Sequence, residues 1–226
     1  DHTGEPGPIA VQIAGTDAAM ADEAADEAND PIIVSASRSG DGVLASQLGA
    51  SVTVIDAEAL DQRQTRIISD VLRDVPGLAV SRAGGIGGVT DVRIRGSEAN
   101  HVLMLIDGIE VTDPYQGGYD FSTLIADPSA RIEVLRGQQS SLYGSDAIGG
   151  VIHYITATGA EDQGHSARGE AGAFGTYSGA ARAGGVVGQL DYAVTGSCYH
   201  TPGTPTARGG SRNIGSDSVG ASAKLI

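Results

Sequence analysis

The feature that most constrains this chain is a two-residue alternation of apolar and polar side chains after about residue 159. In the segment 190–199, Leu, Tyr, Val, Gly and Cys alternate with Asp, Ala, Thr, Ser and Tyr, and the segments 167–174 and 218–225 alternate in the same way. A period of two places successive side chains on opposite faces of a β-strand. Strands of about ten residues with one apolar face are typical of transmembrane β-barrels, although a soluble sheet with one wet face gives the same pattern.

The predicted connections between these strands alternate in length. A tight turn is expected at Gly188-Gln189 and a long polar loop from Thr201 to Asn213. Outer-membrane barrels have short turns on one side of the membrane and long loops on the other. The connections therefore favour the barrel interpretation.

Composition and charge argue against three other classes: a helical bundle, a helical membrane protein and a nucleic-acid-binding protein. The 226 residues include 34 glycines, and each glycine in a helix interior costs about 1 kcal/mol relative to alanine, which disfavours a helical bundle. No apolar run approaches the roughly 20 residues of a membrane-spanning helix. A net charge of -14 argues against a nucleic-acid partner, whose phosphates require a basic surface.

The negative charge is concentrated at the N-terminus. Eight acidic residues and no Lys or Arg precede Pro31. Such a segment repels itself and has little apolar surface to bury, so we expect residues 1–29 to form a disordered acidic arm.

Short helices and strands alternate irregularly through the middle of the chain, which predicts an α+β domain. We expect one helix capped by Asp56 and running to Leu60, and a second capped by Thr65 and ending at Pro76-Gly77. The spacing of Val, Thr, Ile and Leu predicts strands at 31–35, 51–55, 78–81, 92–95, 101–106 and 131–135.

Motifs that would indicate an enzyme are incomplete. Residues 84–88 lack the third glycine of a dinucleotide loop, and residues 143–147 lack the spacing of a nucleophile elbow. The five histidines show no spacing typical of zinc ligands. We therefore expect no catalytic residues, no cofactor and no bound metal.

Two predicted strands end in Arg-Gly, at Arg95 and at Arg136. By the period of two, Arg93 and Arg95 are expected to share one face. These arginines and Glu133 form either surface salt bridges or contacts with carboxylates of an enclosing wall. The residues alone do not decide between these two interpretations.

Six blocks resemble TonB-dependent outer-membrane receptors, nearest to their cobalamin transporter branch. They occur in the family's order at 30–36 (DPIIVSA), 68–77 (ISDVLRDVPG), 93–96 (RIRG), 101–108 (HVLMLIDG), 131–137 (RIEVLRG) and 141–152 (SLYGSDAIGGVI). The resemblance implies an α+β plug domain followed by the first antiparallel strands of a transmembrane β-barrel in the outer membrane of a Gram-negative bacterium.

The expected organisation follows from this resemblance. Residues 1–29 are the acidic arm, 30–36 the TonB box, 37–158 the plug, and 159–226 about four strands of an incomplete barrel. A plugged transporter has about 22 strands. The chain is therefore expected to be part of a longer receptor or a truncated product.

The resemblance also implies three sets of site residues. The TonB box is expected to add as a strand to periplasmic TonB, which is driven by an inner-membrane energising complex, although the same run could be a permanent strand of the plug. Substrate is expected to contact two external plug loops, in which turn chemistry alone could explain the glycines. The residues are Asp30, Pro31, Ile32, Ile33, Val34 and Ser35 for the TonB box; Arg82, Ala83, Gly84, Gly85, Ile86, Gly87, Pro114, Tyr115, Gln116 and Tyr119 for substrate; and Arg93, Arg95, Glu133 and Arg136 for contacts between plug and barrel.

Two positions depart from the family pattern. His153 stands where the family usually has Asn, and the segment 201–218 offers only Asp217 where calcium-dependent cobalamin transporters carry clustered aspartates. The expected function is active uptake of a scarce chelate, either cobalamin or a ferric siderophore, with membrane lipid around the barrel. The alternative is a soluble or surface β-rich binding protein, such as an adhesin or carbohydrate-binding protein, without TonB coupling.

Overall fold

In the computed structural model of the chain, the described residues are 33–34, 43–44, 50–127, 129–205 and 213–226. All of them belong to one compact unit, residues 33–226. The acidic arm at 1–29 lies outside the described residues. The first described element, β1 (Ile33–Val34), pairs antiparallel with β2 (Val43–Leu44).

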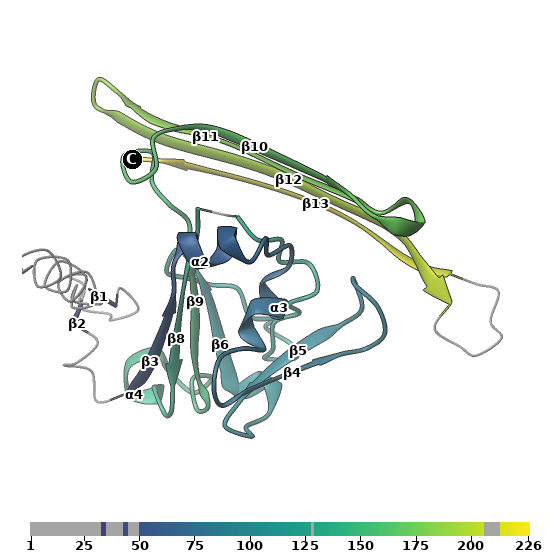
Figure 1. Cartoon of the computed structure of the whole chain (residues 1–226). Helices are drawn as coiled ribbons and strands as arrows, with labels where there is room; N and C mark the ends of the chain where they lie inside the picture. The colour runs from purple at the N-terminus through teal and green to yellow at the C-terminus, as the bar shows by residue number, and fades with distance from the viewer. Residues whose placement is uncertain (1–32, 35–42, 45–49, 128, 206–212) are drawn as a thin grey trace, which may run out of the picture. The chain divides into compact units, whose positions relative to one another are not determined.

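A five-stranded mixed sheet forms the centre of an α+β domain (Figure 1). Strands β6 and β9 run parallel, and the other neighbouring strands are antiparallel. The three middle strands are buried along most of their length, so both faces of the sheet are covered. In spatial order the strands are β3 (Ser51–Ile55), β8 (Arg131–Arg136), β9 (Gly150–Ile155), β6 (Val102–Ile106) and β7 (Ile109–Glu110).

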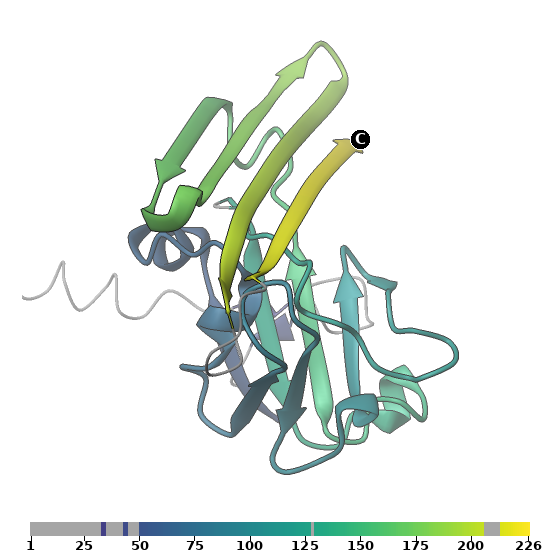
Figure 2. The same cartoon turned by 90° about the vertical axis from the view of Figure 1, so that its right-hand side faces the viewer.

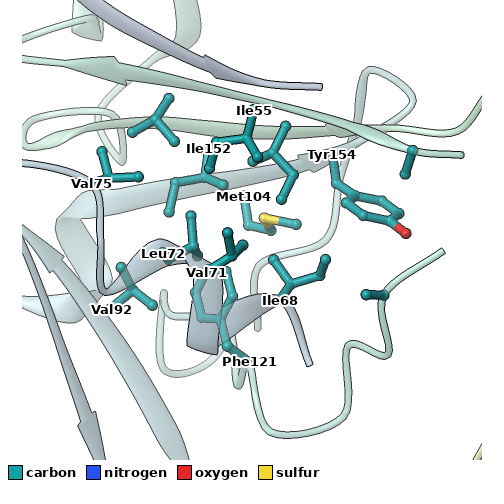
Figure 3. Close-up of a cluster of buried hydrophobic side chains, with 14 of the residues drawn as sticks. Ile55, Ile68, Val71, Leu72, Val75, Val92, Met104, Phe121, Ile152 and Tyr154 are labelled. Carbon is teal, nitrogen blue, oxygen red and sulfur yellow. The ribbon is translucent and has the colours of Figure 1, made fainter. Parts of the chain in front are cut away.

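One face of this sheet packs against two short helices, α2 (Ala57–Gln62) and α3 (Ile68–Leu72). Figure 3 shows Ile68 and Leu72 of α3 beside Met104 and Ile152 of the sheet, and all four side chains are fully buried. Residues three and four apart share one face of a helix, so Ile68 and Leu72 both face the sheet. Each such side chain contributes about 1.5–3 kcal/mol when buried, so this cluster is the main source of the domain's stability.

Both predicted helices form, but one cap and one helix end are wrong, because α3 ends at Leu72 and not at Pro76-Gly77. The Asp56 carboxylate caps α2 as predicted, because it accepts the Ala59 N–H at 2.8 Å. Thr65 does not cap α3: the N-cap residue is Ile67, with no side-chain cap bond. The Ile68 N–H donates instead to the Leu124 carbonyl at 3.1 Å, so a distant segment satisfies the helix end.

A separate hairpin consists of β4 (Leu78–Arg82) and β5 (Thr90–Ile94). The prediction that Arg93 and Arg95 share one strand face is wrong. Arg95 lies beyond the end of β5 with a left-handed φ of 53°, and its N–H donates to the Gly77 carbonyl at 2.7 Å. A period of two holds only along extended backbone, and the chain turns at this residue.

Four long strands form a second antiparallel sheet in chain order, here called the wall sheet (Figure 2). The predicted alternation is confirmed, because Ala193 and Tyr199 are buried on one face of β12 while Val194 on the other face is 49 % exposed. On β13, Val219 of the apolar row is 86 % exposed. The strands are β10 (Gly164–Ala171), β11 (Tyr177–Val187), β12 (Leu190–Pro205) and β13 (Asn213–Leu225).

The tight turn is confirmed by the pairing of Val187 with Leu190 around Gly188-Gln189. The predicted loop from Thr201 to Asn213 is too long, since β12 continues to Pro205 through a bulge that lets the pairing with β13 resume after Thr201. The sequence did not predict β7, β9, α4 (Ser140–Tyr143) or two 3-10 helices, η2 (Ala99–His101) and η3 (Ala173–Gly175). Among the described residues, no helix is both long and apolar enough to span a membrane.

Candidate functional site

The first loop predicted to contact substrate connects β4 to β5. Its backbone reverses through Gly84 and Gly87, whose φ angles of +93° and +87° are left-handed. Turn geometry explains some of these glycines, because a Cβ on Gly88 would lie 2.0 Å from the Ala83 carbonyl oxygen. A Cβ atom placed on Gly84 or Gly85 would have no other atom within 4 Å, so the space beside this backbone is open to a ligand.

Arg82 at the base of this loop is bound within the α+β domain. Its guanidinium donates to Asp70 Oδ1 at 2.7 Å and to Ser69 Oγ at 2.9 Å, and its side chain is 14 % exposed. These contacts tie the base of the loop to helix α3. Direct contact of Arg82 with substrate stays a prediction.

The second predicted loop presents an aromatic side chain. Asp113 Oδ1 accepts the N–H groups of Tyr115 and Gln116 at 2.7 and 3.1 Å, a side-chain turn that fixes the backbone after Pro114. The Tyr115 ring is 96 % exposed. Tyr119 instead packs edge-on against Phe121 at 4.9 Å between ring centroids, and burial raises the pKa of its hydroxyl.

The structure joins the bases of the two loops. Asp120 Oδ1 accepts the Thr90 N–H at 2.9 Å, and the Phe121 N–H donates to the Thr90 carbonyl at 3.0 Å. The tip of the first loop lines a cleft of about 170 Å³ together with residues of the wall sheet and its turns. The lining residues are Gly85, Ile86, Phe174, Thr176, Tyr199, Thr201, Gly203, Thr204 and Ile214.

Phe174 at the edge of this cleft was not predicted as a site residue. The sequence placed it on a strand face, but it lies in the β10–β11 turn with a left-handed φ of 58° and is 76 % exposed. Non-glycine residues with positive φ are uncommon, and they concentrate where function fixes a turn. Apolar and aromatic surface from both parts of the molecule therefore meets at one cleft.

The residues predicted to contact a barrel wall have partners within the α+β domain. Glu133 is fully buried and pairs with Arg131 at 3.0 Å. Arg136 donates to the Pro76 carbonyl at 2.7 Å and to Thr53 Oγ1 at 2.8 Å.

Arg93 and Arg95 are also held within this domain. Arg93 donates to Ser81 Oγ at 2.8 Å, and Arg95 packs close to Gly77 and Gly137. The contacts given for these four residues lie within the α+β domain and include hydrogen bonds to neutral groups, so both interpretations stay open. Contacts to further wall strands stay a prediction.

Other residues connect the α+β domain to the wall sheet. Arg66 forms an ion pair with Glu170 of β10 at 2.5 Å, and Thr195 Oγ1 of β12 donates to Asp127 Oδ2 at 2.9 Å. Sequence periodicity did not identify these pairs, because it predicts the face of a strand and not its partner. The sequence signal that could have identified these residues is their place on the polar face of the alternating strands, where both Glu170 and Thr195 lie.

His153 lies buried in β9, paired across the sheet with Glu133 of β8 and Leu105 of β6. Its Nε2 accepts the Gly108 N–H at 2.9 Å, so the neutral ring carries its proton on Nδ1. Burial lowers the pKa of His153, against the opposing effect of the Glu133 and Asp107 carboxylates, while Arg131 and Lys224 lower it further.

The predicted TonB box lies only partly within the described residues. Ile33 and Val34 form β1, and Asp30, Pro31, Ile32 and Ser35 lie outside the described part. Pairing of Ile33 with Leu44 shows that this backbone can accept a strand neighbour.

Metal ligands are sparse in the described part of the chain. No group of three or more His, Cys, Asp or Glu side chains there has a metal-binding arrangement. Asp217, the lone aspartate of the segment 201–218, pairs with Nδ1 of His200.

Comparison with known proteins decides the family. The model of the TonB-dependent receptor plug domain matches residues 45–151. The chain carries the plug domain of a TonB-dependent receptor. Over 135 residues it is 40 % identical to the vitamin B12 transporter BtuB of Photobacterium profundum, which confirms the resemblance to the cobalamin transporter branch. That match covers 59 % of this chain and 22 % of the transporter, so the chain spans about a fifth of its relative.

Solved structures agree with this fold. The ferric yersiniabactin uptake receptor FyuA of Yersinia pestis is 23 % identical with a TM-score of 0.59, over 80 % of this chain and 29 % of that receptor. A mutant of the ferric enterobactin receptor PfeA of Pseudomonas aeruginosa is 26 % identical with a TM-score of 0.51, over 66 % and 24 % of the two chains. These relatives are transporters and receptors, and the plug followed by antiparallel strands is confirmed. The chain belongs in the outer membrane of a Gram-negative bacterium.

Proposed function

We propose that the intact protein takes up a scarce chelate, cobalamin or a ferric siderophore, across the outer membrane. The observation that carries this proposal is a plug domain joined directly to antiparallel strands whose apolar side chains are exposed. The BtuB relative is a vitamin B12 transporter, and FyuA is an uptake receptor for ferric yersiniabactin. Both substrates are bulky chelates.

Substrate binds where the two plug loops are presented. In the first loop, Gly84 and Gly85 let a ligand approach the backbone closely. In the second loop, the nearly fully exposed Tyr115 ring offers a flat surface on a turn whose backbone is fixed. A tyrosine side chain has few rotatable bonds and the turn already fixes its backbone, so Tyr115 loses less conformational freedom on binding than a longer, more flexible side chain of equal area.

Energy enters through the TonB box. An outer membrane has no nucleotide supply, so work must be delivered from the periplasmic side. A strand of residues 31–35 added to TonB gains about 1 kcal/mol net per backbone hydrogen bond. This gain is no larger than the ordering cost of about 1–2 kcal/mol per residue. The contact is weak and reversible, as a coupling that engages and releases requires.

Binding measurements on the purified intact receptor test the substrate assignment. We expect cyanocobalamin or a ferric siderophore to bind, with an affinity that calcium chelation does not change, because the segment 201–218 has one aspartate and that side chain pairs with His200. Tyr115→Ala should weaken binding about fivefold or more, since aromatic anchors dominate binding energy.

Tyr177→Ala is the matched control, because Tyr177 is an exposed tyrosine on β11 that stacks on His200 rather than on a plug loop. It should bind substrate like the unmodified receptor. A loss of cobalamin affinity of about tenfold or more in chelator contradicts the calcium prediction. A receptor that binds no chelate contradicts the proposed function.

A further inference from the structure

The Asp107-Gly108 turn between β6 and β7 makes polar contacts that the turn itself does not need. Both residues have left-handed φ angles, 48° and 82°, which suffices for a two-residue hairpin turn. The Asp107 carboxylate points elsewhere and accepts the Thr156 N–H at 2.9 Å and the Thr156 hydroxyl at 2.6 Å. It thereby joins the end of β6 to the segment that leaves β9.

A third donor to this carboxylate comes from the wall sheet. Lys224 Nζ of β13 lies 3.3 Å from Asp107 Oδ1 and also donates to the Thr156 carbonyl at 3.0 Å. Lys224 is the single lysine among 226 residues. Its ammonium therefore bridges plug and wall sheet at the exit of the plug.

The position of this bridge relates it to the side from which the plug is pulled. Lys224 is paired with Ala193 of β12, close to the tight Gly188-Gln189 turn. Short turns of outer-membrane barrels lie on the periplasmic side. The bridge is thus at the end of the strand nearest to TonB.

The bridge is also of a kind that can open. The side chains of Lys224 and Asp107 are 28 % and 29 % exposed, and a partly hydrated ion pair is weak and screened by salt. Arg182 of β11 forms a contrasting attachment. Its side chain is 4 % exposed and holds Asp162 Oδ2 together with the carbonyls of Asp162 and Thr158.

We propose that Lys224 is a releasable latch that positions the plug against β13 and lets go of Asp107 when the plug is pulled, whereas Arg182 keeps the connecting segment attached to the wall. The proposal rests on the proposed transport function, whose mechanism it deepens. It identifies Lys224 as a positioning residue with no contact to substrate.

Reactivity of the Lys224 amine reports the latch directly. In the intact receptor in outer-membrane vesicles, an amine-acylating reagent should modify the Lys224 peptide slowly at rest. Asp107→Asn should raise this modification several-fold without substrate, because the charge that holds the ammonium is removed. Arg63→Gln, which removes the exposed Arg63–Asp74 ion pair inside the plug, should leave it unchanged.

A covalent lock tests whether release is required. The two residues are replaced by cysteines, Asp107→Cys and Lys224→Cys, in a receptor whose own cysteine is removed by Cys198→Ser. A short bis-maleimide then crosslinks the two new cysteines in cells. Chelate binding should stay within about twofold of the unmodified receptor while uptake falls at least tenfold. Glu58→Cys with Gln62→Cys, one helical turn apart on the exposed face of α2, takes the same reagent without joining plug to wall and should transport normally.

Uptake by the locked pair at the control rate overturns the latch, as does equal acylation of Lys224 in the unmodified and Asp107→Asn receptors. An unmodified receptor that binds or takes up no chelate overturns the proposed function instead, and the acylation comparison still decides whether the Lys224 contact exists. Lys224→Arg should keep uptake at the level of the unmodified receptor, because the arginine guanidinium can reach the same carboxylate.

Discussion

At the scale of single residues, His153 makes the plug sheet sensitive to acid. The neutral ring accepts the Gly108 N–H, and a proton on Nε2 would remove that acceptor and place a charge in a buried strand. Because burial lowers the folded-state pKa below its ordinary 6.5, the unfolded chain binds this proton more readily. The stabilisation is complete above about pH 6.5 and is lost as the pH falls toward the folded-state value.

Hydrogen exchange at Gly108 in the intact receptor measures this effect. Protection of the Gly108 amide, corrected for intrinsic exchange, should be lower at an acidic pH than at a pH above about 6.5, where the stabilisation is complete. His153→Asn should keep protection nearly constant between these two conditions, because an amide oxygen accepts the N–H at either pH. His165→Asn, at an exposed position of β10, should leave the acid sensitivity as it is. Equal acid sensitivity in the His153→Asn receptor contradicts the assignment.

Of all the features of this protein, the contacts made by individual side chains were the hardest to predict from the sequence. The pair Asp107-Gly108 is typical of a turn, but Lys224, which contacts the Asp107 carboxylate, stands 117 positions away in the chain. Arg95 was expected on a strand, and its left-handed backbone follows from a hydrogen bond to Gly77 that local pattern does not encode. Local sequence specifies conformational preference, and only the assembled fold specifies which side chains meet.

At the scale of elements, the wall strands have two unequal faces, and this inequality was predictable from alternation alone. Val219 on the apolar face is 86 % exposed, while Ser197 on the polar face lines a cavity of about 260 Å³ shared with plug residues. Strand ends were less predictable, as the continuation of β12 to Pro205 shows. A bulge adds strand length without a periodic signal.

Matched charge substitutions test the orientation of these faces. In the intact receptor, Val219→Asp should sharply reduce the amount of folded, heat-modifiable receptor in the outer membrane, because a charge on the lipid face costs up to a few kcal/mol. Ser197→Asp places the same charge on the polar face and should be tolerated much better. Equal losses for the two variants would mean that the wall sheet does not face lipid through Val219.

At the scale of the whole molecule, the proposed mechanism assigns distinct mechanical roles to the plug, the wall sheet and the TonB box. The plug core of α3 and the central sheet is held by fully buried apolar side chains, and polar contacts such as Thr195 with Asp127 join the plug to the wall. A plug with a well-packed core and polar contacts to the wall can move as a unit when it is pulled. The TonB box gives that load a point of application in the proposed mechanism.

The most direct test of this account compares binding with uptake when the TonB box loses a backbone donor. Ile33→Pro in the intact receptor removes the N–H of residue 33 and fixes its φ, so strand addition should fail. We predict chelate binding within about twofold of the unmodified receptor and a loss of uptake of at least tenfold, while Ile33→Ala, which keeps the N–H, retains uptake. Uptake that survives Ile33→Pro, or binding that falls together with uptake, would contradict the account.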